Sequence, residues 1–173
     1  CTLPVVIVSG SGNQGATASL PVIIYAREIK ASQDTLYRAL ILSNLITIHQ
    51  KTGIGRLSAY CGVVSAAVGS GSAMTYLDGG TLKQIKDTIT NTIANISGMI
   101  CDGAKSSCAA KIATSLDAAI LGHKLAMNSC AFEEHTGIVK GDVEDTIATV
   151  GRIASKGMTQ TDRQILYSMT QKA

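Results

Sequence analysis

The chain has 173 residues and a net charge of +3, with 46% hydrophobic and 16% charged residues. This composition fits one globular domain with a sizeable core, and it excludes a disordered chain. The small charge and the lack of basic runs interleaved with aromatic residues argue against nucleic-acid binding. No uninterrupted apolar run reaches about 18 residues, so we expect no membrane-spanning helix.

The chain opens with an apolar segment and a glycine-rich loop. Residues 5–8 are all β-branched, which predicts a strand or a buried extended segment. Residues 9–15 read Ser-Gly-Ser-Gly-Asn-Gln-Gly, a composition that exposes backbone N–H groups and can hold an anion at the start of a helix. A tight turn is the alternative. We expect the following helix to begin near Ala16, with Pro21 in its first turns.

Helical patterns continue through the rest of the chain. Ser32 predicts an N-cap for a helix over 33–51, and Thr81 predicts one for a helix over 82–97. Residues 57–77 are rich in Gly, Ala and Ser, which suits a central helix that its neighbours approach closely. Three more helices are expected over 111–128, 142–155 and 159–171. Because strand-like alternation is weak throughout, the predicted fold class is all-α, a compact multi-helix domain.

A short loop between two cysteines is the strongest local signal of chemistry. Cys101 and Cys108 flank six residues without a bulky apolar side chain, so the loop can fold both thiols toward one metal. An apolar helical run begins at Ala109, and a helix N-terminus favours the thiolate form of a nearby cysteine. Two ordinary buried thiols are the alternative. Cys61, on the expected central helix, adds a third thiol. Because a four-iron cluster normally takes four thiolates, three would leave one iron open to substrate as a Lewis acid.

The five cysteines occur without a recognisable secretory signal. Thiols in such a chain suit a reducing compartment, where they act as ligands or nucleophiles rather than in disulfides. We therefore expect a cytoplasmic protein. The chain also starts at Cys1 without an initiator Met and runs directly into an apolar stretch. This start predicts the C-terminal part of a longer polypeptide.

Three motifs follow one another along the chain. They are Ser-Gly-Ser-Gly-Asn-Gln-Gly at 9–15, Gly-Arg-Leu-Ser-Ala-Tyr-Cys-Gly at 55–62 and Gly-Met-Ile-Cys-Asp-Gly-Ala-Lys-Ser-Ser-Cys at 98–108. Together they resemble the L-cysteine desulfidase family, which is similar to the alpha chain of the iron–sulfur L-serine dehydratases. The resemblance covers essentially all 173 residues as one domain. It implies a helical domain that holds a [4Fe-4S] cluster and converts L-cysteine to pyruvate, ammonia and sulfide.

The same resemblance implies the residues of the site. The cluster ligands would be Cys61, Cys101 and Cys108. The substrate-binding residues would be those of the glycine-rich loop: Ser9, Ser11, Gly12, Asn13, Gln14 and Gly15. Hydroxyl, amide and backbone N–H groups of this kind suit a substrate carboxylate.

Two further residues are candidates for catalysis. Lys105 lies between two of the expected ligands and would pair with the substrate carboxylate or tune the cluster; an ion pair with Asp102 is the alternative. Cys1 would act as a base, as a transient ligand or in neither role. Arg56 is a weaker candidate for binding an anion. Cys130 lies outside the motifs and is expected to be a structural thiol.

Three other functions compete with the desulfidase. An L-serine dehydratase would use the same cluster chemistry, and the sequence does not separate cysteine from serine as the substrate. A pyridoxal-phosphate lyase would share an asparagine loop like residues 11–15, but the strand–helix alternation of such folds is missing. The third is a non-catalytic metal- or thiol-sensing module. The expected partners are an amino-acid substrate and the N-terminal part of the same polypeptide, and a homodimer is left open.

The motifs also predict geometry. The sulfurs of Cys61, Cys101 and Cys108 should converge within a few ångströms of one point, and Cys130 should lie apart. An iron that is open to substrate is also open to oxygen, so protein handled in air should lose its cluster. Without iron, we expect either a disulfide between Cys101 and Cys108, because the glycine-containing loop between them can bend, or clustered free thiols.

Overall fold

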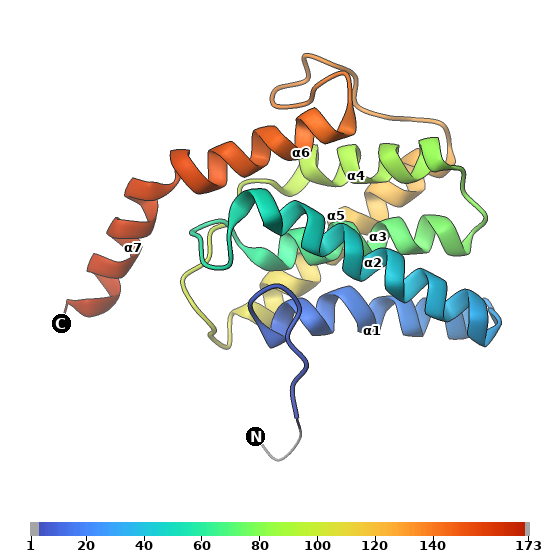
Figure 1. Cartoon of the computed structure of the whole chain (residues 1–173), viewed down its shortest axis with the longest axis horizontal. Helices are drawn as coiled ribbons and strands as arrows, with labels where there is room; N and C mark the ends of the chain where they lie inside the picture. The colour runs from blue at the N-terminus through green and yellow to red at the C-terminus, as the bar shows by residue number, and fades with distance from the viewer. Residues whose placement is uncertain (1–3, 172–173) are drawn as a thin grey trace.

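The computed structural model describes residues 4–171, which contain α-helices and two isolated β-bridges but no strand (Figure 1). The helices are α1 (Gly12–Glu28), α2 (Gln33–Ile54), α3 (Gly62–Leu77), α4 (Leu82–Ile96), α5 (Cys108–Met127), α6 (Val143–Arg152) and α7 (Thr159–Thr170). A short π-helical turn, Ile153–Gly157, joins the last two. The all-α prediction is therefore confirmed.

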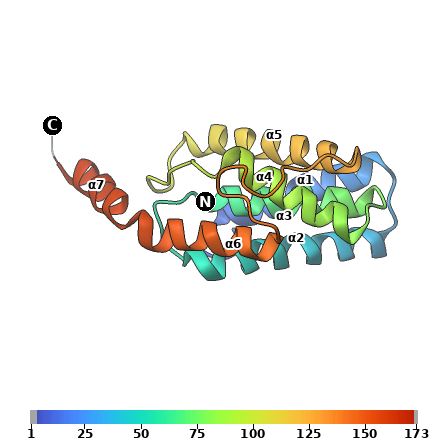
Figure 2. The same cartoon turned by 90° about the horizontal axis from the view of Figure 1, so that it is seen from above.

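Helix α3 is the centre of the domain, packed among α1, α2, α4 and α5 (Figures 1 and 2). Its side chains are buried from Gly62 to Thr75. Small residues allow this packing, because Gly69 lies against the backbone of α2 at Ser43 and Gly71 lies against α5 at Ala119. The prediction of a central small-residue helix is confirmed, but the helix begins at Gly62 rather than at residue 57.

Two predicted helix starts are confirmed by their caps. The hydroxyl of Ser32 accepts a hydrogen bond from the backbone N–H of Thr35 at 3.1 Å and begins α2. Thr81 and Gln84 form a reciprocal capping box that begins α4. The prediction for α1 was wrong by one turn, because the hydroxyl of Ser11 accepts from the N–H of Gln14 and starts the helix at Gly12.

The segment before α1 is extended but not buried, which corrects the expectation for residues 5–8. Val6 is 77% exposed, and its neighbours Val5 and Ile7 are also exposed. The backbone of this segment crosses α1 closely at Gly12 and Gly15, where an added Cβ would strike Val5 and the carbonyl of Val6. These two glycines therefore let the N-terminal segment lie on the helix that follows it.

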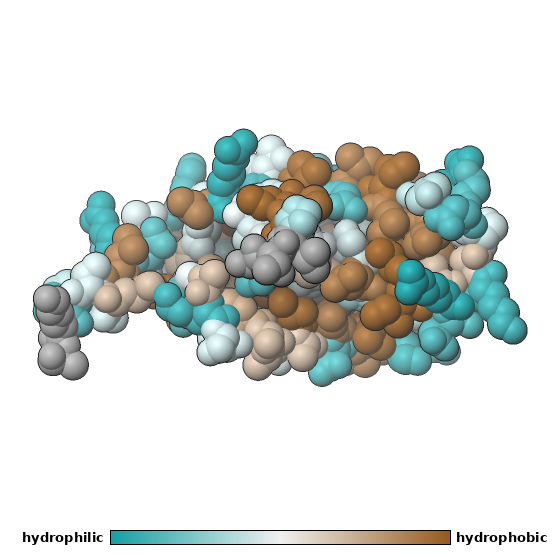
Figure 3. Space-filling view, turned by 90° about the horizontal axis from the view of Figure 1, so that it is seen from below, coloured by the Kyte–Doolittle hydropathy of each residue, from teal (hydrophilic) through white to brown (hydrophobic). Residues whose placement is uncertain are grey.

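Two outer features complete the fold. Helix α7 extends away from the bundle and has no buried residue (Figures 1 and 2). Seen from below, apolar side chains gather over the half of the molecule where α1 runs (Figure 3). They include Leu20 and Ile24 of α1, which are 56% and 58% exposed. No helix within residues 4–171 is long and apolar enough to cross a membrane.

Candidate active site

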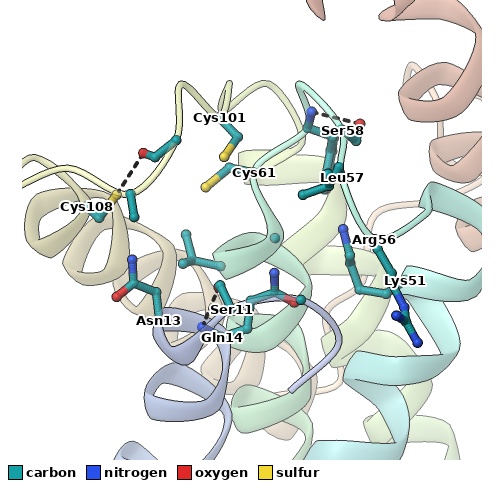
Figure 4. Close-up of a pocket in the computed structure, with 16 residues that line it drawn as sticks. Ser11, Asn13, Gln14, Lys51, Arg56, Leu57, Ser58, Cys61, Cys101 and Cys108 are labelled. Carbon is teal, nitrogen blue, oxygen red and sulfur yellow. Dashed lines mark hydrogen bonds between the residues drawn. The ribbon is translucent and has the colours of Figure 1, made fainter. Parts of the chain in front are cut away.

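A cavity of about 240 Å³ opens where four segments of the chain meet (Figure 4). The segments are the N-terminus of α1, the C-terminal turns of α2, residues 56–63 before and into α3, and the loop that ends at Cys108. All three motifs of the sequence thus contribute to the lining of one cavity. Within the described part of the chain, the cavity is lined by three cysteines and two basic side chains, and by no Asp, Glu or His.

Cys61 and Cys101 are brought together by an isolated antiparallel bridge. Tyr60 pairs with Ile100, the N–H of Cys61 donates to Met99 at 3.0 Å, and the N–H of Cys101 donates to Ala59 at 2.6 Å. Because side chains alternate along extended backbone, the residue after each bridged position points to the same face. The two thiols meet there and share a hydrogen bond. Cys61 is therefore the N-cap residue of α3, whereas the sequence predicted that it lies within that helix.

Cys108 reaches the cavity from a different direction. It is buried and is the first residue of α5; the sequence predicted it at the first turn of a helix but gave the bounds of that helix as 111–128. Its sulfur accepts from the N–H of Lys105 at 3.4 Å and donates to the carbonyl of Gly103 at 3.6 Å. Figure 4 shows this sulfur turned toward its own loop, while the sulfurs of Cys61 and Cys101 face each other.

The two neighbouring thiols have opposite acidities. The hydrogen bond from Cys61 stabilises the thiolate of Cys101 and lowers the pKa of Cys101 to about 6, helped by the backbone at Gly103 and by Lys111. The same hydrogen bond and burial raise the pKa of Cys61. One proton is thus held between two sulfurs, with Cys101 as the thiolate. Lys111 is itself paired with Asp102, and the hydrogen bond from Lys111 lowers the pKa of that carboxyl group.

The motifs imply a metal centre, and the side chains of the cavity decide which kind of centre they fit. Among residues 4–171, no three His, Cys, Asp or Glu side chains are gathered for one metal ion, so the prediction that the sulfurs of Cys61, Cys101 and Cys108 converge within a few ångströms of one point is wrong. A single ion bound by three thiolates would hold their sulfurs within about 4 Å of one another. In a cluster each thiolate binds a different iron, so the sulfurs lie farther apart. Three thiols on one cavity wall, without imidazole or carboxylate, are the donors that iron–sulfur clusters use. The cavity therefore offers the type of donor atom that an iron–sulfur cluster requires.

The glycine-rich loop faces the cysteines across the cavity. Ser11, Asn13 and Gln14 line the cavity together with Gly10, and Figure 4 shows the three side chains below the thiols. In the first turn of α1, the N–H of Gln14 donates to the hydroxyl of Ser11 and the N–H of Gly15 donates to its carbonyl, so the N–H groups of Gly12 and Asn13 are left for a ligand. The predicted binding residues Ser9, Gly12 and Gly15 do not line the cavity. Gly12 and Gly15 instead accommodate the N-terminal segment, as described above.

A family profile described as "Serine dehydratase alpha chain" matches residues 1–167. The chain belongs to the serine dehydratase alpha chain family. Its relatives include "UPF0597 proteins" from three bacteria, Treponema denticola, Desulfitobacterium hafniense and Finegoldia magna. The first two are each 54% identical over 169 residues, which are 98% of this chain and 39% of the relative. The third is 49% identical over 172 residues, which are 99% of this chain and 41% of the relative.

This member of the serine dehydratase alpha chain family thus spans about two fifths of the length of the curated relatives it matches. No solved structure matches it. The motifs that indicated the resemblance lie within the matched residues.

The remaining predicted residues lie in different places. Lys105 is exposed and does not line the cavity, and Asp102 pairs with Lys111 instead of with Lys105. Arg56 does line the cavity. Cys130 is exposed, away from the other thiols, and its sulfur donates to Asn128. Cys1 lies outside the described residues, so its catalytic role and that of Lys105 stay predictions.

Sequence reasoning missed Lys51, which lies on α2 and is only 4% exposed. Burial lowers the pKa of Lys51, and the nearby thiols Cys101 and Cys61 oppose that shift. A signal for Lys51 was present in the sequence, because Ser43 and Thr47 precede it at intervals of four on the buried face of α2. Continuing that repeat by one turn places Lys51 among buried residues.

Proposed function

We propose that this protein is an iron–sulfur-dependent lyase that eliminates sulfide from L-cysteine to give pyruvate and ammonia. The observation that carries the proposal is the shared cavity, where three thiols from two distant segments face the N-terminus of α1. Membership of the serine dehydratase alpha chain family supports a lyase-type activity.

In this proposal Cys61, Cys101 and Cys108 hold a [4Fe-4S] cluster. When bound, such a cluster with three protein ligands supplies one iron that acts as a Lewis acid. Cys101 is prepared for this role, because a pKa of about 6 makes it a thiolate at neutral pH and the thiolate is the ligand form.

The other side of the cavity binds the substrate. The hydroxyl of Ser11 is occupied in capping α1, so the side-chain amides of Asn13 and Gln14 and the backbone N–H of Asn13 are the donors left for a carboxylate. An anion at a helix N-terminus is favoured both by these N–H groups and by the helix dipole. The residue that removes the Cα proton is not among the carboxylates or histidines of residues 4–171, because none of them lines the cavity.

L-Serine is the second candidate substrate, favoured by the description of the matched family. Both reactions remove a Cα proton and a leaving group from Cβ, so the same cavity serves either. They differ in the atom that leaves, which is sulfur for cysteine and oxygen for serine.

Anaerobic reconstitution of the full-length protein with iron and sulfide tests the proposal. We expect a broad visible absorption from the cluster, and formation of pyruvate and sulfide from L-cysteine at a higher kcat/KM than pyruvate from L-serine. The reverse order of kcat/KM would make the protein a serine dehydratase. A reconstituted protein that acts on neither amino acid would instead support a metal- or thiol-sensing module.

A further inference from the structure

The buried lysine of the cavity has a role that the three motifs do not explain. Lys51 is 4% exposed, it lines the cavity from α2, and its ammonium makes no hydrogen bond or ion pair with any group of residues 4–171. Other lysines of the bundle differ, because Lys83, Lys86 and Lys111 each pair with an aspartate. Among residues 4–171 the groups that stabilise this positive charge are the nearby thiols Cys101 and Cys61, and an anion that enters the cavity would stabilise it further.

The surroundings of Lys51 point to an anion that comes from outside the chain. The described lining of the cavity holds no carboxylate; it holds two cationic side chains, Lys51 and Arg56, and one thiolate, Cys101, which the proposed cluster would bind. Asn13, whose N–H has no acceptor in the first turn of α1, lines the same cavity. Figure 4 shows Lys51 and Arg56 on one side of Ser11 and Gln14, with the cysteines along the opposite edge. An anionic group bound there would be held between two independent sets of donors.

We propose that the ammonium of Lys51 binds the α-carboxylate of the amino-acid substrate, together with the N-terminal N–H groups of α1. This inference rests on the proposed lyase function and adds a specificity-determining residue to it. Lys51 contacts the carboxylate before and during the reaction, so it contributes mainly to binding. Its loss raises KM and changes kcat much less.

The test uses Lys51→Met, which keeps the length of the side chain and removes its charge. L-Alanine and L-alaninamide are the probes, because neither has a leaving group on Cβ and they differ in the charged carboxylate. Their inhibition constants are measured against L-cysteine elimination by the reconstituted full-length protein. Their binding to the cluster-free protein is measured separately by saturation-transfer NMR. Lys83→Met, on the exposed surface of α4, is the control for loss of one positive charge.

We expect Lys51→Met to weaken the binding of L-alanine by about tenfold to a hundredfold, the range for a lost hydrogen bond between charged groups. Inhibition by L-alaninamide and the iron content of the protein should not change, and Lys83→Met should behave like the wild type. Lys51→Arg should recover part of the L-alanine affinity, and Lys51→Gln provides a second neutral variant if Met does not pack.

Three outcomes would overturn the role of Lys51. They are unchanged binding of L-alanine, equal weakening of both probes, or a fall in iron content that shows Lys51 acting on the cysteines. Failure of the proposed function is a separate result. It would appear as wild-type protein that eliminates neither amino acid, while the NMR comparison of the two probes would still test Lys51.

Discussion

At the scale of single residues, the arrangement of the thiols follows from one bridge. Tyr60 and Ile100 pair across two short extended segments, and the alternation of extended backbone turns the following residues, Cys61 and Cys101, to one face. Cys108 is fixed separately by the start of α5 and by the turn at Gly103. The cavity therefore contains one pair of thiols and one thiol apart from them.

This arrangement changes the disulfide expected in metal-free protein. In air, Cys61 and Cys101 should be oxidised to a disulfide while dioxygen is reduced to hydrogen peroxide. Their thiols are already hydrogen-bonded, and the pKa of about 6 makes Cys101 the attacking thiolate. Cys108 is engaged with its own loop, so the pairing with Cys101 that its spacing in the sequence indicated is not favoured.

Peptide mapping without reductant identifies the bond. The fragment that joins Cys61 to Cys101 should dominate, and Cys108 should be recovered as a free thiol. Cys61→Ser is the matched control and should abolish this fragment. A Cys101–Cys108 fragment in the wild-type protein would contradict the geometry.

The residues of the site differ in how readily the sequence predicted them. Ser11, Asn13 and Gln14 were found because a glycine-rich polar loop before a helix is a local pattern. The meeting of Cys61 with Cys101 was expected only from the family resemblance, because it depends on a pairing between two segments that lie far apart in the chain. Lys51 was missed because its burial is set by α3, which packs against α2.

At the scale of helices, the caps were predictable and the interiors of loops were not. Ser32 and Thr81 act through N–H groups three residues away, so the sequence alone contains the whole interaction. The start of α3 was placed too early because residues 57–61, Leu-Ser-Ala-Tyr-Cys, contain no glycine, proline or charged residue that marks a helix boundary. The bridge between Tyr60 and Ile100 holds them extended, and that partner is distant in sequence.

Close packing around α3 gives a prediction for stability. Gly69→Ala should lower the free energy of unfolding by about 1–3 kcal/mol, because the new methyl group meets the carbonyl of Ser43 and the hydroxyl of Thr47. Gly53→Ala, in α2, is the matched control. Its methyl group would lie 3.5 Å from Gly151, an ordinary contact, so helix propensity should leave the protein equally or more stable. Urea denaturation measures both. Equal midpoints for the two variants would contradict close approach of α2 and α3.

A partly buried polar network joins α1, α3 and α5 at the end of α3 remote from the cysteines. His123 lies within 3.3 Å of Asp78 and shares a hydrogen bond with Thr75 at 3.0 Å, while Tyr25 donates to Asp78 at 2.8 Å. Burial lowers the pKa of His123; Asp78 opposes this shift and Lys124 adds to it. The unfolded chain therefore binds a proton on this histidine more readily than the folded protein does.

The free energy of unfolding should thus decrease as the pH falls below 6.5, the ordinary pKa of histidine. In His123→Gln the decrease between about pH 7 and pH 5 should be smaller, since Gln does not titrate. Urea denaturation across this range measures the effect. His135→Gln, at an exposed histidine, serves as the control and should keep the wild-type dependence. A His123→Gln variant with an unchanged pH profile would show that another group is responsible.

At the scale of the whole molecule, one face of the bundle is unusually apolar. A groove of about 490 Å³ runs between α1 and α5 and is lined by Leu20, Ile24, Leu116 and Ile120, among others. Part of this face is visible in Figure 3. Contiguous apolar surface of this kind marks an interface. In the relatives, about three fifths of the polypeptide lies outside the matched part, so a covering segment is available.

We expect that remaining part of the polypeptide to cover the groove in the full-length protein. Ile24→Cys, placed in the groove, should react slowly with a maleimide, because the covering segment excludes the reagent. Leu82→Cys, at the start of α4 and 70% exposed, is the control and should react quickly. Mass spectrometry of the labelled peptides separates both sites from the exposed Cys130. Rapid labelling at residue 24 would show that the groove is open. A covering segment of the same polypeptide protects residue 24 at every protein concentration. If protection is instead lost on dilution, while the mass in solution halves, the groove is covered by a second copy of the chain.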